Sequence, residues 1–366
     1  MKKSLYFSLL LLTVIVCSSA NVAPPTPSKT PAKPRNVILM IGDGMGLAQI
    51  CAGFVANGGY LNFERFKHIG FSRTNSADDY ITDSAAGATA LSTGKKTYNK
   101  AVGVDADSLP AKTILEYAEE NQYATGMVVT CPVTHATPAS FIAHQPSRSM
   151  DEAIALDFLK TDIDVFIGGG QNFFDKRTDG KNLLNDLRKN GYQVATDLKS
   201  IYAVQSGKLA GFMAEKDPLP VNKGRDTSFL KDASMHAIKL LQPNKNGFFL
   251  MIEGSQIDWG GHNNDIDYIM AEMLDFDRTL AAVLDFAAKD GNTLVIVTAD
   301  HETGGLSLNS GTSYRKKHVE AAFTTKSHTG IMVPVFAFGP GAEEFSGIYQ
   351  NTEIFYKMMN YYGFRK

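Results

Sequence analysis

The sequence has few cysteines and no surplus of charge of one sign. Three cysteines in 366 residues are too few for a disulfide scaffold or a thiolate zinc cluster, so any metal would be held by nitrogen and oxygen. Lys and Arg total 36 against 38 Asp and Glu, and without a basic stripe this balance argues against nucleic-acid binding. Hydrophobic residues make up 44% of the chain, which excludes disorder, collagen and coiled coil and predicts a substantial core.

The apolar run near the N-terminus is too short to span a bilayer comfortably. Residues 1–20 combine two lysines, this run and a small-residue end, which is typical of a cleaved export signal rather than an uncleaved anchor. Cys17 leaves open a lipoprotein acylated at that residue. We therefore expect a periplasmic or extracellular protein, bound to a membrane only if it is lipidated at Cys17. Residues 21–35 are a proline-rich linker, and residues 36–366 are expected to form a single domain.

Two cysteines remain after removal of the signal. Cys51 and Cys131 could form a disulfide in an oxidising compartment, but the sequence does not give the distance between them. We expect two buried thiols instead.

From residue 36 onward, continuous apolar runs alternate with helical patterns, and no internal repeat is visible. This alternation predicts an α/β fold, a three-layer α/β/α sandwich with a mainly parallel central sheet. Residues 171–225 are more polar and irregular, and we expect them to be excursions at the sheet edge. The predicted strands are 36–41, 125–130, 164–168, 247–252, 293–298 and 333–338, and the predicted helices are 46–57, 84–92, 111–121, 151–160, 180–190, 228–242, 265–289 and 352–361.

Polar side chains lie next to the ends of these strands, where ligands of an open parallel sheet collect. Each residue alone could equally be a turn, capping or surface residue. Together, the histidines and carboxylates at one rim would repel one another without cations, so the sequence predicts a site for several metal ions. Zinc favours His with Asp, and magnesium favours Asp, Glu and the Thr hydroxyl. The residues at this rim are Asp43, His135, Thr137, Glu253, Asp258, His262, Asp300, His301 and His328.

Ser84 begins a predicted alanine-rich helix. A serine in this position is usually a helix cap, but it could also be a nucleophile. Backbone amides and the helix dipole would stabilise an anion there, and a metal could hold its alkoxide. Residues 83–86 lack the Gly-x-Ser-x-Gly elbow of the acyl hydrolases. Arg148 offers a planar fork for two phosphate oxygens, although alone it would be taken for a surface arginine.

Six blocks of the sequence closely resemble alkaline phosphatases. They read NVILMIGDGMG, TDSAAGATALSTGKKTYN, THATPASFIAHQPSR, MIEGSQIDWGGH, VTADHETGG and SHTGIMVPVFAFGPG, in order from about residue 36 to 341. The resemblance implies hydrolysis of small-molecule phosphate monoesters through a phosphoserine, with two zinc ions, one magnesium ion and the family's usual homodimer. It makes Ser84 the nucleophile and Arg148 the phosphate-binding residue. It assigns Asp258, His262 and His328 to the first zinc, Asp43, Asp300 and His301 to the second, and Asp43, Thr137 and Glu253 to magnesium.

Two positions depart from the enteric bacterial pattern of this family. His135 stands where that form has an aspartate, and Trp259 where it has a lysine. His135 could ligate the third metal or lie behind its ligands, and we favour the second arrangement. Trp259 could contact substrate or only pack beside the site. Between His301 and His328 there are only 26 residues, where many relatives insert larger interface segments. The sequence therefore does not decide whether this chain forms the family's usual dimer.

Other functions on a similar scaffold fit the sequence less well than a monoesterase does. A sulfatase needs a Cys or Ser, a Pro two residues after it and then an Arg. Residues 84–87 do not meet this pattern. A phosphodiesterase would usually leave room for a second ester group where Arg148 contacts monoesters. A non-catalytic phosphate- or metal-binding protein is disfavoured because the nucleophile, the arginine and the ligand set are all intact.

Overall fold

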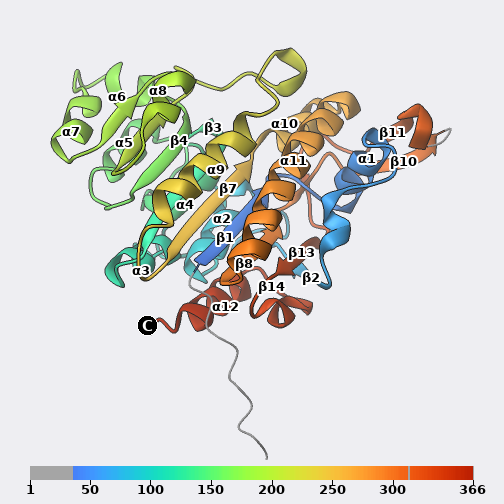
Figure 1. The fold of residues 1–366 in the computed structure, drawn as a ribbon. Coiled ribbons are helices and arrows are strands. Elements are labelled where there is room, and N and C mark those ends of the chain that lie inside the picture. The colour runs from blue at the N-terminus through green and yellow to red at the C-terminus, as the bar shows by residue number, and fades with distance from the viewer. Residues whose placement is uncertain (1–35, 312–313, 366) are drawn as a thin grey trace, which may run out of the picture. The chain divides into compact units, whose positions relative to one another are not determined.

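The computed structural model describes residues 36–311 and 314–365; the predicted export signal, Cys17 and the proline-rich linker lie outside them. The main sheet contains β1 (Asn36–Gly42), β2 (His68–Arg73), β3 (Ala124–Pro132), β4 (Val165–Gly169), β5 (Gln193–Ala195), β6 (Leu209–Phe212), β7 (Phe248–Gly254), β8 (Thr293–Thr298), β13 (Val333–Phe338) and β14 (Gly347–Gln350). Its strand order is β14-β2-β13-β8-β1-β7-β3-β4-β6-β5 (Figure 1). Two small antiparallel pairs join β9 (Glu302–Thr303) to β12 (His328–Thr329) and β10 (Leu306–Gly311) to β11 (Val319–Phe323).

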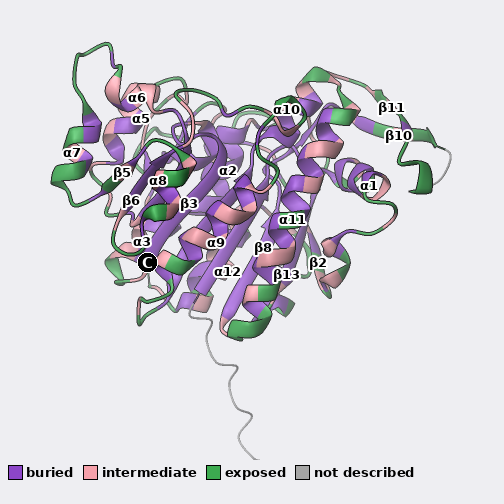
Figure 2. Ribbon diagram, turned by 45° about the horizontal axis from the view of Figure 1, so that its top comes forward, coloured by how far each residue is buried: buried purple, intermediate pink, exposed green. Residues whose placement is uncertain are grey.

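Helices cover both faces of this sheet because its central strands are apolar on both sides. Along β1, Val37, Leu39 and Ile41 pack into one core, and Ile38 and Met40 pack into the other. The first core contains α2 (Ser84–Thr93), α3 (Ile114–Glu120), α4 (Ala136–Ile142), α5 (Asp151–Asp157), α6 (Asn172–Asp175), α7 (Leu183–Lys189) and α12 (Thr352–Tyr362). The second contains α1 (Leu47–Ala56), α8 (Leu198–Ala203), α9 (Phe229–Leu241), α10 (Gln256–Asn263) and α11 (Ile266–Asp290). Figure 2 shows the buried strands in purple between these helices. The predicted three-layer α/β/α sandwich is confirmed.

The register of the central strands brings polar residues to one rim. β1 runs parallel to β7 and β8, with Gly42 opposite Gly254 and Ile41 opposite Thr298. The residues that follow these strands therefore emerge side by side. β13 runs antiparallel to β8, so the beginning of β13 lies at this same rim. His328 precedes β13, whereas the other residues of this rim follow their strands. The antiparallel direction of β13 brings His328 to the same rim.

All six predicted strands are present, but some features differ from expectation. Residues 171–225 contain β5 and β6, which extend the sheet, so they are more than excursions at its edge. The short helices α4 and α10 were not predicted. Cys131 is a buried free thiol, whereas Cys51 is a free thiol exposed on α1, so the expectation of two buried thiols is wrong for Cys51. Its neighbours Ile50 and Ala52 occupy the buried face of the helix. Within residues 36–311 and 314–365, no helix combines the length and apolar content needed to cross a membrane.

Candidate active site

Ser84 is the first residue of α2, and its side chain is buried. Asp83 caps the helix, and its Oδ1 accepts a hydrogen bond of 3.0 Å from the backbone N–H of Ala86. Ser84 Oγ lies 3.2 Å from His301 Nε2. The hydroxyl therefore lies next to an imidazole nitrogen and at the positive end of a helix, which would stabilise a developing negative charge.

The first group of candidate metal ligands comprises two residues of α10 and one of β12, the short strand that precedes β13. Asp258, His262 and His328 can present ligand atoms within 4.8 Å of one another. Asp258 Oδ2 lies 3.3 Å from His262 Nε2, and its Oδ1 lies 3.6 Å from His328 Nε2. Each histidine points its Nδ1 at a carbonyl oxygen, His262 at Lys326 (2.6 Å) and His328 at Thr82 (2.8 Å). Because Nδ1 must donate to these oxygens, each neutral ring keeps a lone pair on Nε2 for a metal ion.

A second group follows β1 and β8 and is completely buried. It consists of Asp43, Asp300 and His301. His301 Nε2 lies 3.5 Å from Asp43 Oδ1 and 3.3 Å from Asp300 Oδ2. Both carboxylate oxygens of Asp43, and Oδ2 of Asp300, make no hydrogen bond to any described residue. A Cβ at Gly87 would lie 3.1 Å from Asp300, so the glycine allows α2 to approach this group closely.

A third group lies at the ends of β3 and β7, where Cys131, His135 and Glu253 come together. The Cys131 thiol donates to Glu253 Oε2 at 3.4 Å. Within the described part of the chain, Glu253 Oε1, Thr137 Oγ1 and His135 Nδ1 are buried without a hydrogen-bond partner. Cys131 was not among the predicted site residues, although its position directly after a predicted strand could have indicated it. Buried, unpartnered oxygens are costly unless a proton or a cation compensates them.

Arg148 joins the N-cap of α2 to the third group. Its Nη1 donates to Asp83 Oδ2 at 3.1 Å, and its Nη2 lies 3.2 Å from His135 Nε2. A guanidinium can only donate, so His135 Nε2 accepts and the ring proton lies on Nδ1. The half-buried Trp259 ring meets the His135 ring edge to face, with 6.1 Å between centroids. Trp259 thus lies beside the third group.

Thr303 connects the first and second groups, and the sequence analysis did not assign it. Its hydroxyl donates to Asp258 Oδ1, and Thr303 Oγ1 also lies 3.2 Å from His301 Nδ1. The rings of His301 and His328 stack with centroids 3.5 Å apart. The position of Thr303 two residues after His301, within one of the conspicuous motifs, was the only available signal.

Burial raises the pKa values of most of the clustered carboxyl groups. Burial first, and then the charges of Asp300, Asp258 and Glu253, raise the pKa of Asp43 well above its ordinary range. Burial, with Asp300, raises the pKa of Glu253 to about 8, and burial, with Asp258, raises that of Asp300 to about 7. Burial also acts on Asp258, but the hydrogen bond from His262 and the neighbouring histidines outweigh it and lower its pKa. Without cations, several of these carboxyl groups would therefore hold protons, which a metal ion would displace.

The histidines divide into neutral and charged rings. Burial lowers the pKa of His301 well below its ordinary value, and burial with the nearby Arg148 lowers that of His135 to about 3. Burial also lowers the pKa of His328. The bond to Asp258 raises the pKa of His262 to about 9. Neutral imidazoles are the form that binds metals.

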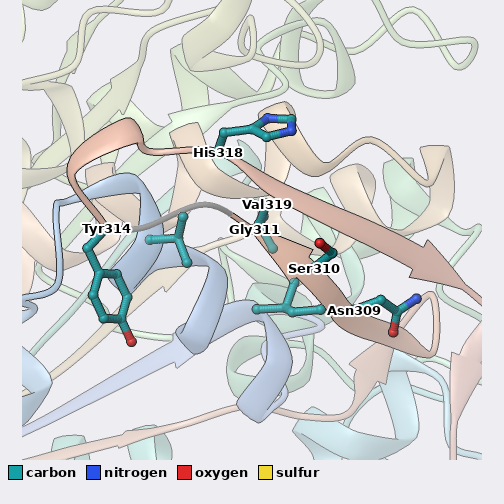
Figure 3. A pocket seen from close by; sticks show the side chains of 8 residues that line it. Asn309, Ser310, Gly311, Tyr314, His318 and Val319 are labelled. Carbon is teal, nitrogen blue, oxygen red and sulfur yellow. The ribbon is translucent and has the colours of Figure 1, made fainter.

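A separate surface cavity of about 380 Å³ lies at the β10–β11 hairpin. Figure 3 shows Asn309, Tyr314 and His318 around it. None of the residues assigned to the three metal-binding groups lines this cavity.

The chain matches the family model described as "Alkaline phosphatase" over residues 34–322 and 308–363. It is 35% identical to alkaline phosphatase 3 of Bacillus subtilis over 87% of each chain. It is 32% identical to the alkaline phosphatase of Escherichia coli, covering 90% of this chain and 86% of that one. The solved alkaline phosphatase of the Antarctic bacterium TAB5 is 45% identical, covers 91% of this chain and 100% of its own, and superposes with a TM-score of 0.87. A histidine-to-aspartate variant of that enzyme, with Mg bound in its M3 site, is 44% identical with the same TM-score and covers 92% of this chain. The chain therefore belongs to the alkaline phosphatase family, whose members are phosphoric monoester hydrolases.

Proposed function

We propose that this protein hydrolyses phosphate monoesters through a phosphoserine at Ser84, beside two zinc ions and one magnesium ion. The observation that carries this proposal is the position of the Ser84 hydroxyl. It lies at the start of α2 and 3.2 Å from His301, within a group of buried metal-binding side chains. Together with Arg148, this arrangement offers a nucleophile, cation ligands and a phosphate clamp within one site.

The side chains present fit these ions. The first and second groups offer nitrogen and carboxylate oxygen, which suit zinc. For magnesium, Asp43, Thr137 and Glu253 offer oxygens that lack hydrogen bonds within the described residues. We place His135 behind these ligands, because its Nε2 accepts from Arg148 and its Nδ1 then carries the proton. The histidine-to-aspartate variant of the TAB5 enzyme has Mg bound in its M3 site, so a site of this family can hold magnesium.

The proposed reaction has two in-line steps. When bound, the cations neutralise charge on the ester and favour the ionised forms of the hydroxyl and of water. Ser84 Oγ attacks phosphorus, the bond to the alcohol oxygen breaks, and the alcohol leaves. Water then attacks the phosphoserine from the opposite side, the P–Oγ bond breaks, and inorganic phosphate leaves. The two inversions give net retention at phosphorus.

The other residues bind and orient the phosphoryl group. Arg148 presents two N–H groups to two phosphate oxygens, and its contacts with Asp83 and His135 fix the plane of the guanidinium. The backbone N–H groups at the start of α2 favour an anion beside Ser84. Trp259 is proposed to line the place where the substrate enters. Because a diester carries one negative charge fewer than a monoester dianion and brings a second ester group, the site should prefer monoesters.

We also propose how the protein is organised in the cell. Residues 1–20 would direct export, residues 21–35 would form a linker, and residues 36–366 would act as one catalytic domain outside the cytoplasm. Acylation at Cys17 would tether this domain to a membrane.

The test compares Ser84→Ala with Ser92→Ala, a second buried serine on the same helix. Both variants and the parent are loaded with zinc and magnesium, and turnover of an aryl phosphate and the matched diester is measured. Acid quenching with labelled substrate traps the phosphoenzyme. We expect the parent to prefer the monoester, and Ser84→Ala to lose the phosphoenzyme while keeping a slow hydrolysis. Full activity of Ser84→Ala, or phosphate binding without turnover in the loaded parent, would overturn the proposal.

A further inference from the structure

The segment that carries Arg148 is fastened to a neighbouring loop by backbone hydrogen bonds. Arg148 N donates to the carbonyl oxygen of Lys100 at 2.7 Å, and Gln145 and Val102 exchange two bonds of 3.0 Å. Lys100 N in turn donates to Asp83 Oδ1 at 3.0 Å. The loop therefore connects the N-cap of α2 with the phosphate-binding arginine.

His144 fixes both segments to helix α3. Its Nδ1 contacts the carbonyl oxygen of Gly103, and its Nε2 lies 3.0 Å from Glu116 Oε1. Glu116 is held in place because it forms a capping box with Thr113. The contact between the segments is close: Gly103 has a φ of 59°, and a Cβ there would lie only 1.9 Å from the oxygen of Ala143.

The partners of His144 require a proton on each of its ring nitrogens. A carbonyl oxygen and an ionised carboxylate only accept hydrogen bonds, so both nitrogens donate and the ring is an imidazolium. The charged groups facing it are Glu116 on α3 and Asp157 on α5, whose Oδ2 accepts from His144 N at 3.3 Å. Lys160 binds the other oxygen of Asp157 at 2.6 Å. Burial by itself lowers the pKa of His144, but the bonds to Glu116 and Gly103 and the nearby acidic charges outweigh it and raise the pKa.

We propose that His144 is a positioning residue, whose imidazolium form holds the Arg148 segment against α3 and keeps the guanidinium in register with Ser84. Loss of either ring proton removes one of the two hydrogen bonds of the His144 ring and weakens phosphate binding by Arg148. This inference rests on the proposed function, in which Arg148 binds phosphate. It adds a side chain, outside the three metal-binding groups, that strengthens phosphate binding while its ring carries both protons and ceases to do so when the ring loses one.

The first experiment uses His144→Gln in the metal-loaded full chain. We measure kcat, KM for an aryl phosphate and the inhibition constant of inorganic phosphate from pH 7 to 10. At pH 7 we expect KM and the inhibition constant to rise about tenfold, with a smaller change in kcat, because a displaced binding group weakens binding. With rising pH, the inhibition constant of phosphate for the variant, divided by that for the parent, should fall toward one. The parent then loses a hydrogen bond of the His144 ring that the variant already lacks. His236→Gln, which changes a half-buried histidine packed on Tyr202, is the matched control and should leave all three constants unchanged.

A double-mutant cycle with Arg148→Ala separates positioning from general destabilisation. If His144 acts through Arg148, then His144→Gln should add almost nothing in the Arg148→Ala background. Full additivity, or unchanged phosphate inhibition in His144→Gln, would overturn the inference. Glu116→Gln removes the same contact from the other side and replaces His144→Gln in every measurement if that variant does not fold. Normal phosphate binding by Arg148→Ala would instead refute the proposed role of Arg148, so the two failures are distinguishable.

Discussion

Removal of the metal ions should make the protein less stable as the pH rises from 7 to 9. In the cation-free site, burial and the nearby Asp300 raise the pKa of Glu253 to about 8, from an ordinary value of 4.5. The unfolded chain loses this proton well below pH 7, whereas the folded chain keeps it until about pH 8. Stability falls with pH wherever the folded state binds more protons than the unfolded state, so the free energy of unfolding must decrease through this range.

The size of the decrease follows from the same pKa. At Glu253 the folded chain binds more protons than the unfolded chain, and this difference, integrated from pH 7 to 9, comes to about one pH unit. The free energy of unfolding therefore falls by about 1.4 kcal/mol over this range. His262, whose pKa Asp258 raises to about 9, changes stability in the same direction, but its partly exposed ring makes a smaller contribution. His301, with its lowered pKa, is neutral in both states above pH 7 and adds nothing. In the metal-loaded protein the ligands are already deprotonated, so this decrease should be absent.

Urea unfolding at pH 7, 8 and 9, with chelator or with zinc and magnesium, measures the effect. We expect the stability difference between the loaded and stripped proteins to widen by at least about 1.4 kcal/mol from pH 7 to 9. Glu253→Gln should remove the part of this decrease that belongs to Glu253, while the raised pKa values of Asp43 and Asp300 leave a remainder in the stripped protein. Glu320→Gln, at an exposed position on β11, should leave the decrease unchanged. Equal stability of the stripped protein at pH 7 and 9, or an undiminished decrease in Glu253→Gln, would refute the reasoning.

Three further predictions concern single side chains of the site. Arg148→Ala should raise the inhibition constant of inorganic phosphate roughly tenfold to a hundredfold, because two charge-assisted bonds are lost, and an unchanged constant would remove Arg148 from phosphate binding. His135→Asp should tighten magnesium binding, measured by calorimetry on zinc-loaded protein, because a carboxylate adds an oxygen where an imidazole now lies; weaker binding would contradict this. Thr303→Val keeps the side-chain shape but leaves Asp258 without its hydroxyl donor, so zinc affinity in a competition with a chelator should fall about tenfold. Unaltered zinc affinity would show that Thr303 does not orient this carboxylate.

The sheet could be predicted because its central strands are buried on both faces and form continuous apolar runs. Residues 36–41 and 247–252 are of this kind, and the observed β1 and β7 contain them. The short helix α4 and the three-residue strand β5 could not be predicted in this way. Their few residues do not complete a hydrophobic period, and tertiary packing determines their conformation.

The site residues were predictable where a strand end carried a carboxylate or a histidine. Cys131, Thr303 and His144 were missed for a different reason. Each forms a bond to a residue far away in the sequence: Cys131 to Glu253, Thr303 to Asp258 and His144 to Glu116. A cysteine, a threonine or a histidine has an ordinary structural role in most places, and only the fold shows the distant partner.

The position of His328 shows how strand direction determines the chemistry of this rim. A parallel strand in place of β13 would carry the preceding residue to the opposite end of the sheet, away from Asp258 and His262. Because β13 is antiparallel, a residue 66 positions after His262 in the chain comes within 3.2 Å of it, Nε2 to Nε2. Two imidazoles with facing nitrogens do not attract each other unless a proton or a cation lies between them. The first group of candidate metal ligands therefore stabilises the junction between α10 and the segment leading into β13 only when a proton, as on His262, or a cation lies between the two rings.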